Sequence, residues 1–215
     1  MLQQQTMSSA NSAKSGSHAY RVRPMSRAIA APMSPAAWGV AVVEASIGFE
    51  WLLSGLNKAL SPNFVSGLAS ELRTNLQGNP NRWYASLANS LIIPQARFFA
   101  LIAEGGELLV ALGMFVGAAL WLSGRVQASQ QARRLNLGVM LALVGGALMS
   151  ANYAVMNGDT LPGINAAKAF NEGLSIDSLL TMISLGLLIV HLAASRAPGR
   201  PVPTAAGSMN HATRR

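Results

Sequence analysis

Four long apolar runs, separated by shorter polar stretches, dominate the pattern of the sequence. A helix needs about 20 mostly apolar residues to cross a hydrocarbon core about 30 Å thick. Runs of this length predict membrane-spanning helices at residues 38–60, 98–122, 135–156 and 176–194. The runs are continuous and lack the alternation of apolar and polar positions that barrel strands show. The predicted fold is therefore all-α, an integral membrane four-helix bundle.

The segment between the first two predicted spans is too long for a simple turn and has a pattern of its own. Phe64, Leu68 and Leu72 recur at helical spacing, and a second apolar stretch, which begins at Trp83 and Tyr84, follows the turn signal NPN. We predict two short interfacial helices over the outer mouth of the bundle, with Trp83 and Tyr84 at the level of the lipid headgroups. The segment is either a lid over a site or an interfacial anchor without a ligand role.

Both ends of the chain differ from this apolar middle. Residues 1–35 are rich in Ser, Ala and Gln and contain no acidic residue, a composition that cannot bury a core. We predict disordered basic cytoplasmic tails at residues 1–35 and 196–215, on either side of a four-span membrane domain at 36–195. An organellar transit peptide is the alternative for the first tail.

Composition and charge support a membrane protein and indicate its orientation. Of the 215 residues, 51% are hydrophobic and 11% are charged, which is too apolar for a typical soluble domain. Most Lys and Arg residues lie in the two tails and in the link between the second and third spans. The positive-inside rule then places both termini in the cytoplasm. The net charge of +8 needs no nucleic acid as partner, because no basic and aromatic pattern suited to base stacking is present.

The sequence lacks the residues that several kinds of chemistry need. Cysteine is absent, which excludes a thiol relay, a disulfide or an iron–sulfur cluster within the chain. Of the three histidines, only His191 lies in a predicted span, and its position near the cytoplasmic end predicts an interfacial residue rather than a haem or metal ligand. The sequence has no nucleotide-binding or zinc-protease motif. We therefore expect no metal, haem or nucleotide site.

Polar residues inside two spans predict a site in the outer half of the bundle. Glu50, Ser54 and Asn57 recur at i, i+4 and i+7 on one face of the first span. Glu104 and Glu107 are i, i+3 neighbours on the second span. A charged group inside a bilayer costs roughly 2.5–3.5 kcal/mol on insertion scales, so such groups normally face the bundle interior or a wet cavity.

Other polar residues reach the same depth. Lys58 and Arg97 lie at the outer ends of the first two spans, and Asn152 and Tyr153 lie near the outer end of the third. We expect these side chains to converge with the acids of the first two spans.

Two interpretations of this polar cluster stay open. In the first, Glu50, Glu107 and Asn152 point into the bundle at similar depth and line a ligand pocket. In the second, the polar groups pair only to hold four helices together. Glu44 is left out of the pocket, because it lies nearer the cytoplasmic end on a different helix face.

The second span and the segment before it resemble a known family. Residues 79–120 read NPNRWYASLANSLIIPQARFFALIAEGGELLVALGMFVGAAL, in which a tryptophan–tyrosine loop leads to a proline and then to a span with Gly106, Glu107, Leu108 and Gly113. This stretch is similar to the signature region of the DoxX family, which includes the DoxD-type small subunit of thiosulfate:quinone oxidoreductase.

Further positions match the same family. Gly55 and Lys58 stand at the end of the first span, and residues 148–165 read LMSANYAVMNGDTLPGIN, similar to the ending of the family's third span. The resemblance covers about residues 38–194. Glu104 is an acid additional to the family pattern.

The resemblance implies a membrane subunit associated with electron transfer, in a bacterial or archaeal cell membrane and bound to a partner subunit or a larger membrane complex. A quinone is the candidate cofactor, and thiosulfate or another small sulfur species is the candidate substrate. In that case Glu107 or Glu50 would accept or deliver the protons of quinone reduction. Asn152 and Tyr153 would bond a quinone carbonyl.

The other residues of the predicted pocket would bind an anion or line the pocket. An anion would approach Lys58 and Arg97 from the aqueous side, and Ser54, Asn57 and Glu104 would complete the lining. The alternative function is a noncatalytic accessory or assembly subunit of a larger membrane complex. A transporter is a third interpretation, against which four spans without an evident inverted repeat count.

Overall fold

A computed structural model describes residues 34–126, 129–160 and 175–196, and the helices in them belong to one compact unit. The tails predicted at 1–35 and 196–215 lie almost wholly outside these residues. The chain has four helices long and apolar enough to cross a membrane. They are α1 (Pro35–Ala59), α4 (Ala96–Leu122), α5 (Gln130–Met156) and α6 (Ile176–Arg196). The described residues contain no strand, so the all-α bundle is confirmed.

Capping explains why α1 and α5 begin before their apolar runs. The Ser34 hydroxyl accepts a hydrogen bond of 3.3 Å from the Ala37 N–H, and Pro35 occupies the first helical position. The Ser129 hydroxyl caps α5 in the same way, with a 3.1 Å bond from the Ala132 N–H. In α5 a polar first turn, Gln130 to Arg133, precedes the apolar residues, whereas α1 begins with Pro35 and two alanines.

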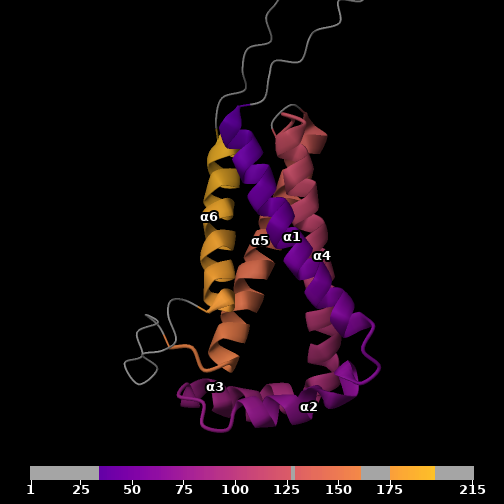
Figure 1. Cartoon of the computed structure of the whole chain (residues 1–215), viewed down its shortest axis with the longest axis vertical. Coiled ribbons are helices and arrows are strands. Elements are labelled where there is room, and N and C mark those ends of the chain that lie inside the picture. Colours follow the sequence, from indigo (N-terminus) through magenta and orange to yellow (C-terminus); the bar gives the residue numbers. More distant parts are fainter. Residues whose placement is uncertain (1–33, 127–128, 161–174, 197–215) are drawn as a thin grey trace, which may run out of the picture. The chain divides into compact units, whose positions relative to one another are not determined.

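The four long helices pack in the order α1, α4, α5, α6 (Figure 1). α1 crosses α4, α4 lies beside α5, and α5 lies beside α6. The start of α1 and the end of α6 share one end of the bundle, which we name the tail end. The opposite end, which we name the loop end, carries α2 (Phe64–Asn75) and α3 (Arg82–Leu87).

Glycines let the long helices approach closely. A Cβ at Gly55 of α1 would lie 2.8 Å from the Leu108 side chain of α4, so no larger residue fits there without a shift. A Cβ at Gly113 of α4 would overlap the Ala142 Cβ of α5. Small residues at helix contacts are typical of membrane bundles, where close packing rather than apolar burial holds helices together.

The two predicted interfacial helices are present as α2 and α3. α3 continues through a π turn (Ala88–Ile92) and a 3-10 turn (Ile93–Gln95) into α4. Together these segments bury a small apolar cluster that contacts the end of α5. Its buried members are Leu72, Leu76, Tyr84, Ala88 and Ile93.

The two aromatic residues of α3 lie in different environments. Trp83 is 64% exposed, whereas Tyr84 is only 3% exposed. The Tyr84 hydroxyl donates to Asn152 Oδ1 of α5 at 3.0 Å. Tyr84 is therefore buried against α5, because its hydroxyl finds a partner there and its ring joins the apolar cluster, and its headgroup level stays a prediction.

The NPN turn fastens this segment to α5. Asn79 Nδ2 donates to the carbonyl oxygens of Val155 and Met156 at 3.0 and 2.8 Å. Asn81 Nδ2 donates to those of Val155 and Asp159 at 3.1 and 2.8 Å. The last carbonyls of a helix have no partner inside the helix, so the two amides supply partners to Val155 and Met156, and the bond to Asp159 holds the residues that follow α5. The motif is a cap for α5 as well as a turn.

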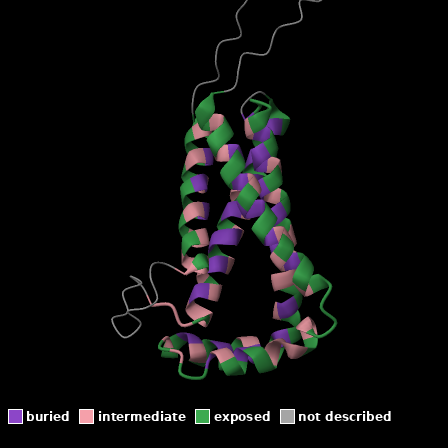
Figure 2. Cartoon of the chain, in the orientation of Figure 1, coloured by how far each residue is buried: buried purple, intermediate pink, exposed green. Residues whose placement is uncertain are grey.

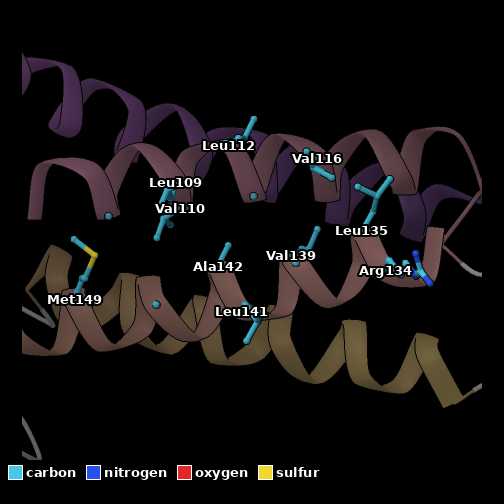
Figure 3. A pocket seen from close by; sticks show the side chains of 14 residues that line it. Leu109, Val110, Leu112, Val116, Arg134, Leu135, Val139, Leu141, Ala142 and Met149 are labelled. Atoms are coloured by element: carbon cyan, nitrogen blue, oxygen red, sulfur yellow. The ribbon is translucent and has the colours of Figure 1, made fainter. Parts of the chain in front are cut away.

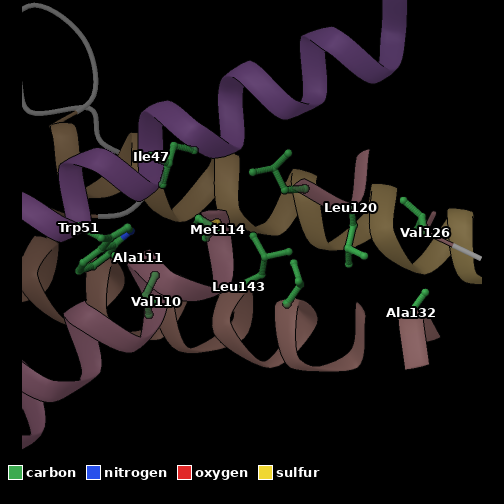
Figure 4. Close-up of a cluster of buried hydrophobic side chains, with 11 residues drawn as sticks. Ile47, Trp51, Val110, Ala111, Met114, Leu120, Val126, Ala132 and Leu143 are labelled. Carbon is green, nitrogen blue, oxygen red and sulfur yellow. The ribbon is translucent and has the colours of Figure 1, made fainter. Parts of the chain in front are cut away.

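An apolar core that includes Trp51, Met114 and Leu143 fills the middle of the bundle (Figure 4). Many large apolar residues are exposed instead, and Figure 2 shows exposed residues along each of the long helices. In each membrane-length helix no more than 33% of the most apolar window is buried within the chain. An outward apolar surface of this extent suits contact with lipid or with other membrane subunits.

Candidate functional site

An ion pair near the loop end joins α1, α4 and α5. Lys58 Nζ, in the last turn of α1, donates to Glu107 Oε1 at 2.7 Å and to Glu107 Oε2 at 2.8 Å. The Tyr153 hydroxyl of α5 donates to Glu107 Oε1 at 2.7 Å. Glu107 is fully buried, whereas the Lys58 side chain is 22% exposed. We name Lys58, Glu107 and Tyr153 the loop-end triad.

The triad is closely bonded. An ammonium group has three donors, and the third bond of Lys58 goes to Ser54 Oγ at 2.8 Å, one turn back on α1. Lys58 Nζ also lies 5.6 Å from the centroid of the Tyr153 ring, within the range of a cation–π contact. A buried carboxylate is tolerated when it is paired and hydrogen bonded, and the triad meets both conditions for Glu107.

The triad can handle protons. An ammonium and a phenol, both donors, surround one carboxylate that is shielded from water. When charge develops nearby, a proton can shift among three such groups without water having to reorganise.

The structure brings together only some of the predicted site residues. Glu107, Lys58, Tyr153 and Ser54 form one bonded group. Glu104, one turn away on α4, is half-buried and lies outside the bonded group.

The other predicted residues lie elsewhere. Glu50, Asn57 and Arg97 are exposed on the surface of the bundle. Asn152 is exposed as well and accepts its hydrogen bond from Tyr84 rather than facing the triad. The expectation that Glu50 and Asn152 point into the bundle beside Glu107 is therefore wrong.

The rotational phase of α1 explains the error for Glu50 and Asn57. The polar residues of α1 that face the bundle are Glu44, Trp51 and Lys58, which recur every seven residues and so share one side of the helix. Glu50 and Asn57 each precede a member of this series by one position. One position turns a side chain by about 100°, which points both residues away from the bundle.

A second buried polar cluster lies near the tail end. His191 Nε2 of α6 and Glu44 Oε1 of α1 are hydrogen bonded, and both residues are fully buried. His191 Nδ1 lies 2.5 Å from Asn136 Oδ1 of α5, and the Trp121 indole N–H of α4 points to His191 Nε2 at 3.2 Å. We name Glu44, Trp121, Asn136 and His191 the tail-end cluster.

Sequence reasoning missed this cluster. The prediction that His191 is an interfacial residue is wrong, because α1, α4 and α5 enclose it with polar partners. Glu44 lies near the tail end, apart from Glu107, which agrees with its exclusion from the predicted pocket, but its pairing with His191 was not predicted. The available signal was the seven-residue spacing from Glu44 to Trp51 and from Trp51 to Lys58, since it puts both charges on one face of α1.

An apolar groove of about 500 Å³ runs between α4 and α5 (Figure 3). Gly106 and Met149 line it toward the loop end, and Arg134 lines it toward the tail end. Leu109 and Leu141 in its lining are 67% and 65% exposed, so the groove opens on the outer surface of the bundle.

The described residues hold no group of three or more His, Asp or Glu side chains placed to bind a metal ion.

Comparison with known proteins adds no family assignment. No family model, curated protein or solved structure matches the chain. The resemblance to the DoxX family stays a prediction from the residues that carry it.

Proposed function

We propose that the chain is a DoxX-like membrane subunit associated with quinone-linked electron transfer, with the loop-end triad as its proton-handling site. The observation that carries the proposal is Glu107, a fully buried carboxylate bonded by both an ammonium and a phenol in a bundle of membrane-length helices. An ionisable residue inside a membrane bundle is a functional-site hypothesis by default, because insertion is costly. The resemblance of residues 79–120 supplies the electron-transfer part.

The groove between α4 and α5 supports a quinone as the ligand. Its apolar lining suits the tail of a membrane quinone, and its exposed side would admit that tail from the lipid. Gly106 lines the groove toward the loop end of the bundle and directly precedes Glu107 in α4. Full reduction of a quinone takes up one proton for each electron, and Lys58 and Tyr153 are the nearest donors to Glu107.

The electrons in this proposal come from outside the chain. With no cysteine to react with sulfur, the chain leaves the oxidation of thiosulfate or another small sulfur species to a partner subunit. The products are then the oxidised sulfur species and the quinol, and the triad supplies protons to the second of these. Arg97 and Lys58, near the loop end, would attract an anionic substrate.

The proposed location is a bacterial or archaeal cell membrane, with the tail end on the cytoplasmic side. Arg125, Arg133 and Arg134 lie in and beside the α4–α5 link at that end, and Arg196 ends α6 there. Basic residues concentrate on the cytoplasmic side of membrane proteins, which supports this orientation.

A noncatalytic accessory subunit is the second candidate function. It is favoured by the closed bonding of the triad, in which Lys58 and Glu107 find their partners within the chain. It is also favoured by outward apolar residues on α4 and α6, which would contact a larger membrane complex. In this case the triad ties α1, α4 and α5 together and takes no part in a reaction.

Exchange of one carboxylate for an amide separates the two functions. Glu107→Gln removes the charge and keeps the size, and Glu104→Gln makes the same change one turn away, outside the bonded group. If the triad serves quinone reduction, Glu107→Gln should lower turnover by about 10²-fold, as is typical for a lost acid or base, while Glu104→Gln stays near the unchanged protein. The measurement is quinone reduction in membranes, divided by the amount of assembled complex.

The accessory function predicts a different pattern. Glu107→Gln would then reduce the amount of assembled complex and leave the turnover of each complex unchanged. That result would remove the catalytic proposal and keep the structural one.

A further inference from the structure

The tail-end cluster and two polar groups midway along the bundle have no part in the function proposed above. Trp51 of α1 and Ser184 of α6 lie at this middle level, each seven residues from a member of the tail-end cluster, Glu44 or His191. Lys58 follows Trp51 by another seven residues. Seven residues of helix rise about 10 Å, so polar groups recur at three levels through the bundle.

The hydrogen bonds of the tail-end cluster indicate where its protons lie. Asn136 Nδ2 donates to Ser195 Oγ at 2.7 Å, and Ser195 Oγ donates to the His191 carbonyl oxygen at 2.7 Å, which orients the Asn136 amide. Asn136 Oδ1 can only accept, so His191 Nδ1 carries a hydrogen. His191 Nε2 faces both the Glu44 carboxyl group and the Trp121 indole N–H. The nitrogen has one lone pair and can accept from only one of them at a time, and its bond to Glu44 needs one further proton between the two groups. The pair therefore stores one proton inside the bundle.

The second oxygen of Glu44 stays open. Glu44 Oε2 is buried and has no hydrogen-bond partner among the described residues. It lies against Gly117 of α4, where a Cβ would be only 2.7 Å away. A buried acceptor next to a shared proton fits a site that takes up and releases protons better than a closed structural pair.

Two more unpartnered groups mark the middle level. Trp51 Nε1 and Ser184 Oγ are buried and have no hydrogen-bond partner within the part of the chain that the structure describes. Both lie 3.7 Å from the position that a Cβ at Gly146 of α5 would occupy. An N–H donor and a hydroxyl that lie near the same glycine are partners of the kind that a buried water needs. Ser150 continues toward the loop end and donates to the Gly146 carbonyl oxygen at 2.9 Å.

We propose that the interior of the bundle is a proton path, with Glu44 and His191 as its tail-end proton-binding site and a water held by Trp51 and Ser184 as its middle station. The pair passes its shared proton to water and takes another from the tail end, so no other reactant is needed. The loop-end triad is the opposite end of the path. The path does not depend on quinone chemistry, and its test uses none.

The apolar core limits the rate of this proton transfer. Met114 and Leu143 are fully buried among the residues around Trp51 (Figure 4). Such side chains offer a proton no hydrogen bond, so water must enter between the levels for each transfer. We therefore expect a slow flux rather than an open channel.

Proton flux into vesicles that contain the full chain tests the path. The vesicles enclose a pH-sensitive dye, and a potassium gradient with valinomycin supplies the driving potential. The Cβ of Gly146→Ala would lie 3.7 Å from both Trp51 Nε1 and Ser184 Oγ and 3.1 Å from Val110 Cγ1, so it takes volume beside both polar groups and presses on Val110. Gly145→Ala adds the same methyl group one position away, where it meets only Val110 at 3.8 Å. We expect Gly146→Ala to lower the flux by about ten-fold or more, because it displaces the water of the middle station, and Gly145→Ala to leave it unchanged.

Two results would overturn the path: equal flux in the two alanine variants, or flux in the unchanged protein no greater than in vesicles without protein. Ser184→Ala gives a second test if Gly146→Ala does not insert, because it removes one partner of the water and adds no volume. A flux that Ser184→Ala leaves unchanged would also overturn the path.

The tail-end site has its own measurement. Nitrogen NMR of histidine-labelled protein in vesicles reports the hydrogens on His191, and the chain contains only two other histidines, His18 and His211. Glu44→Gln should change the His191 Nε2 signal and lower the proton flux, whereas Glu50→Gln, an exposed change on the same helix, should alter neither. An identical His191 signal with and without the Glu44 carboxyl group would rule out the shared proton.

Discussion

At the scale of single residues, the loss of Lys58 and the loss of the Glu107 charge should lower the stability of the bundle by different amounts. Glu107 is fully buried, and Lys58 is one of two residues that bond its carboxylate. Lys58 is partly exposed and has a long side chain, so its ammonium can move toward the interface when the carboxylate is removed. Loss of the lysine should therefore cost more than loss of the acid's charge.

Lys58→Met should destabilise the bundle by about 3–5 kcal/mol, because it leaves a buried carboxylate without its counter-charge. Glu107→Gln should cost distinctly less. Reversible unfolding in mixed micelles with increasing amounts of a denaturing detergent measures the loss of stability in both variants. Arg97→Met, an exposed change at the loop end, is the control. Equal losses for Lys58→Met and Glu107→Gln would show that the two side chains do not depend on each other in this unequal way.

At the scale of helices, glycine positions decide how closely neighbours approach. Gly113 of α4 meets Ala142 of α5 with no room for a side chain, whereas Gly138 of α5 has no atom within 4 Å of its Cβ position. The same substitution at the two sites should therefore have opposite consequences, although both glycines lie in helices of similar length.

Gly113→Ala should force α4 and α5 apart and lower the stability of the bundle by about 1–3 kcal/mol, as overpacking does elsewhere. Gly138→Ala should raise it slightly, since alanine is a better helix former than glycine. The micelle unfolding experiment compares them, and a stable Gly113→Ala protein would contradict the close contact.

A second element-scale feature is the attachment of α2 and α3 to α5 through Asn79 and Asn81. The double change Asn79→Ala and Asn81→Ala removes four hydrogen bonds to carbonyl oxygens. We expect faster protease cleavage between α2 and α3, with the helix content of the long spans kept. Gln77→Ala, an exposed change in the same turn, is the control and should not alter cleavage. Unchanged cleavage in the double variant would mean that the apolar cluster alone holds the segment.

At the scale of the whole molecule, outward apolar surface and the distribution of charge set the relation to the membrane. Four helices have the length and composition to cross a bilayer, and they expose large apolar side chains on their outer faces. In the sequence, most Lys and Arg residues come before α1, between α4 and α5 or at the start of α5, and from the end of α6 onward. These two properties together predict that the loop end lies outside the cytoplasm.

Cysteine labelling tests that orientation on a chain with no cysteine of its own. Ser70→Cys places a thiol on the exposed side of α2, and Gln131→Cys places one at the exposed start of α5. In intact cells an impermeant reagent should label Ser70→Cys, and Gln131→Cys should label only after the membrane is opened. Labelling of both thiols in intact cells would reject the predicted topology.

The sequence by itself determined the elements of this protein. The length of each apolar run predicted four spans, and helical spacing after the first span predicted α2 and α3, because hydrophobic length and local periodicity are properties of neighbouring residues. It also pointed to Glu107 and to Lys58 as members of a polar site. Their bond across 49 positions agrees with that prediction, although spacing along the chain does not show that these two side chains pair with each other.

Only the tertiary structure decided which polar residues meet. Glu50 and Glu44 are both acids of α1, and nothing local to the sequence shows which one faces the bundle, since that depends on how α1 is rotated against α4. His191 meets Glu44 across 147 positions and Asn136 across 55. Such meetings depend on helix rotation and tilt, which follow from close contacts such as those of Gly55 and Gly113 with neighbouring helices. A buried polar cluster is therefore a property of the packed bundle, because its partners come from helices far apart in the chain.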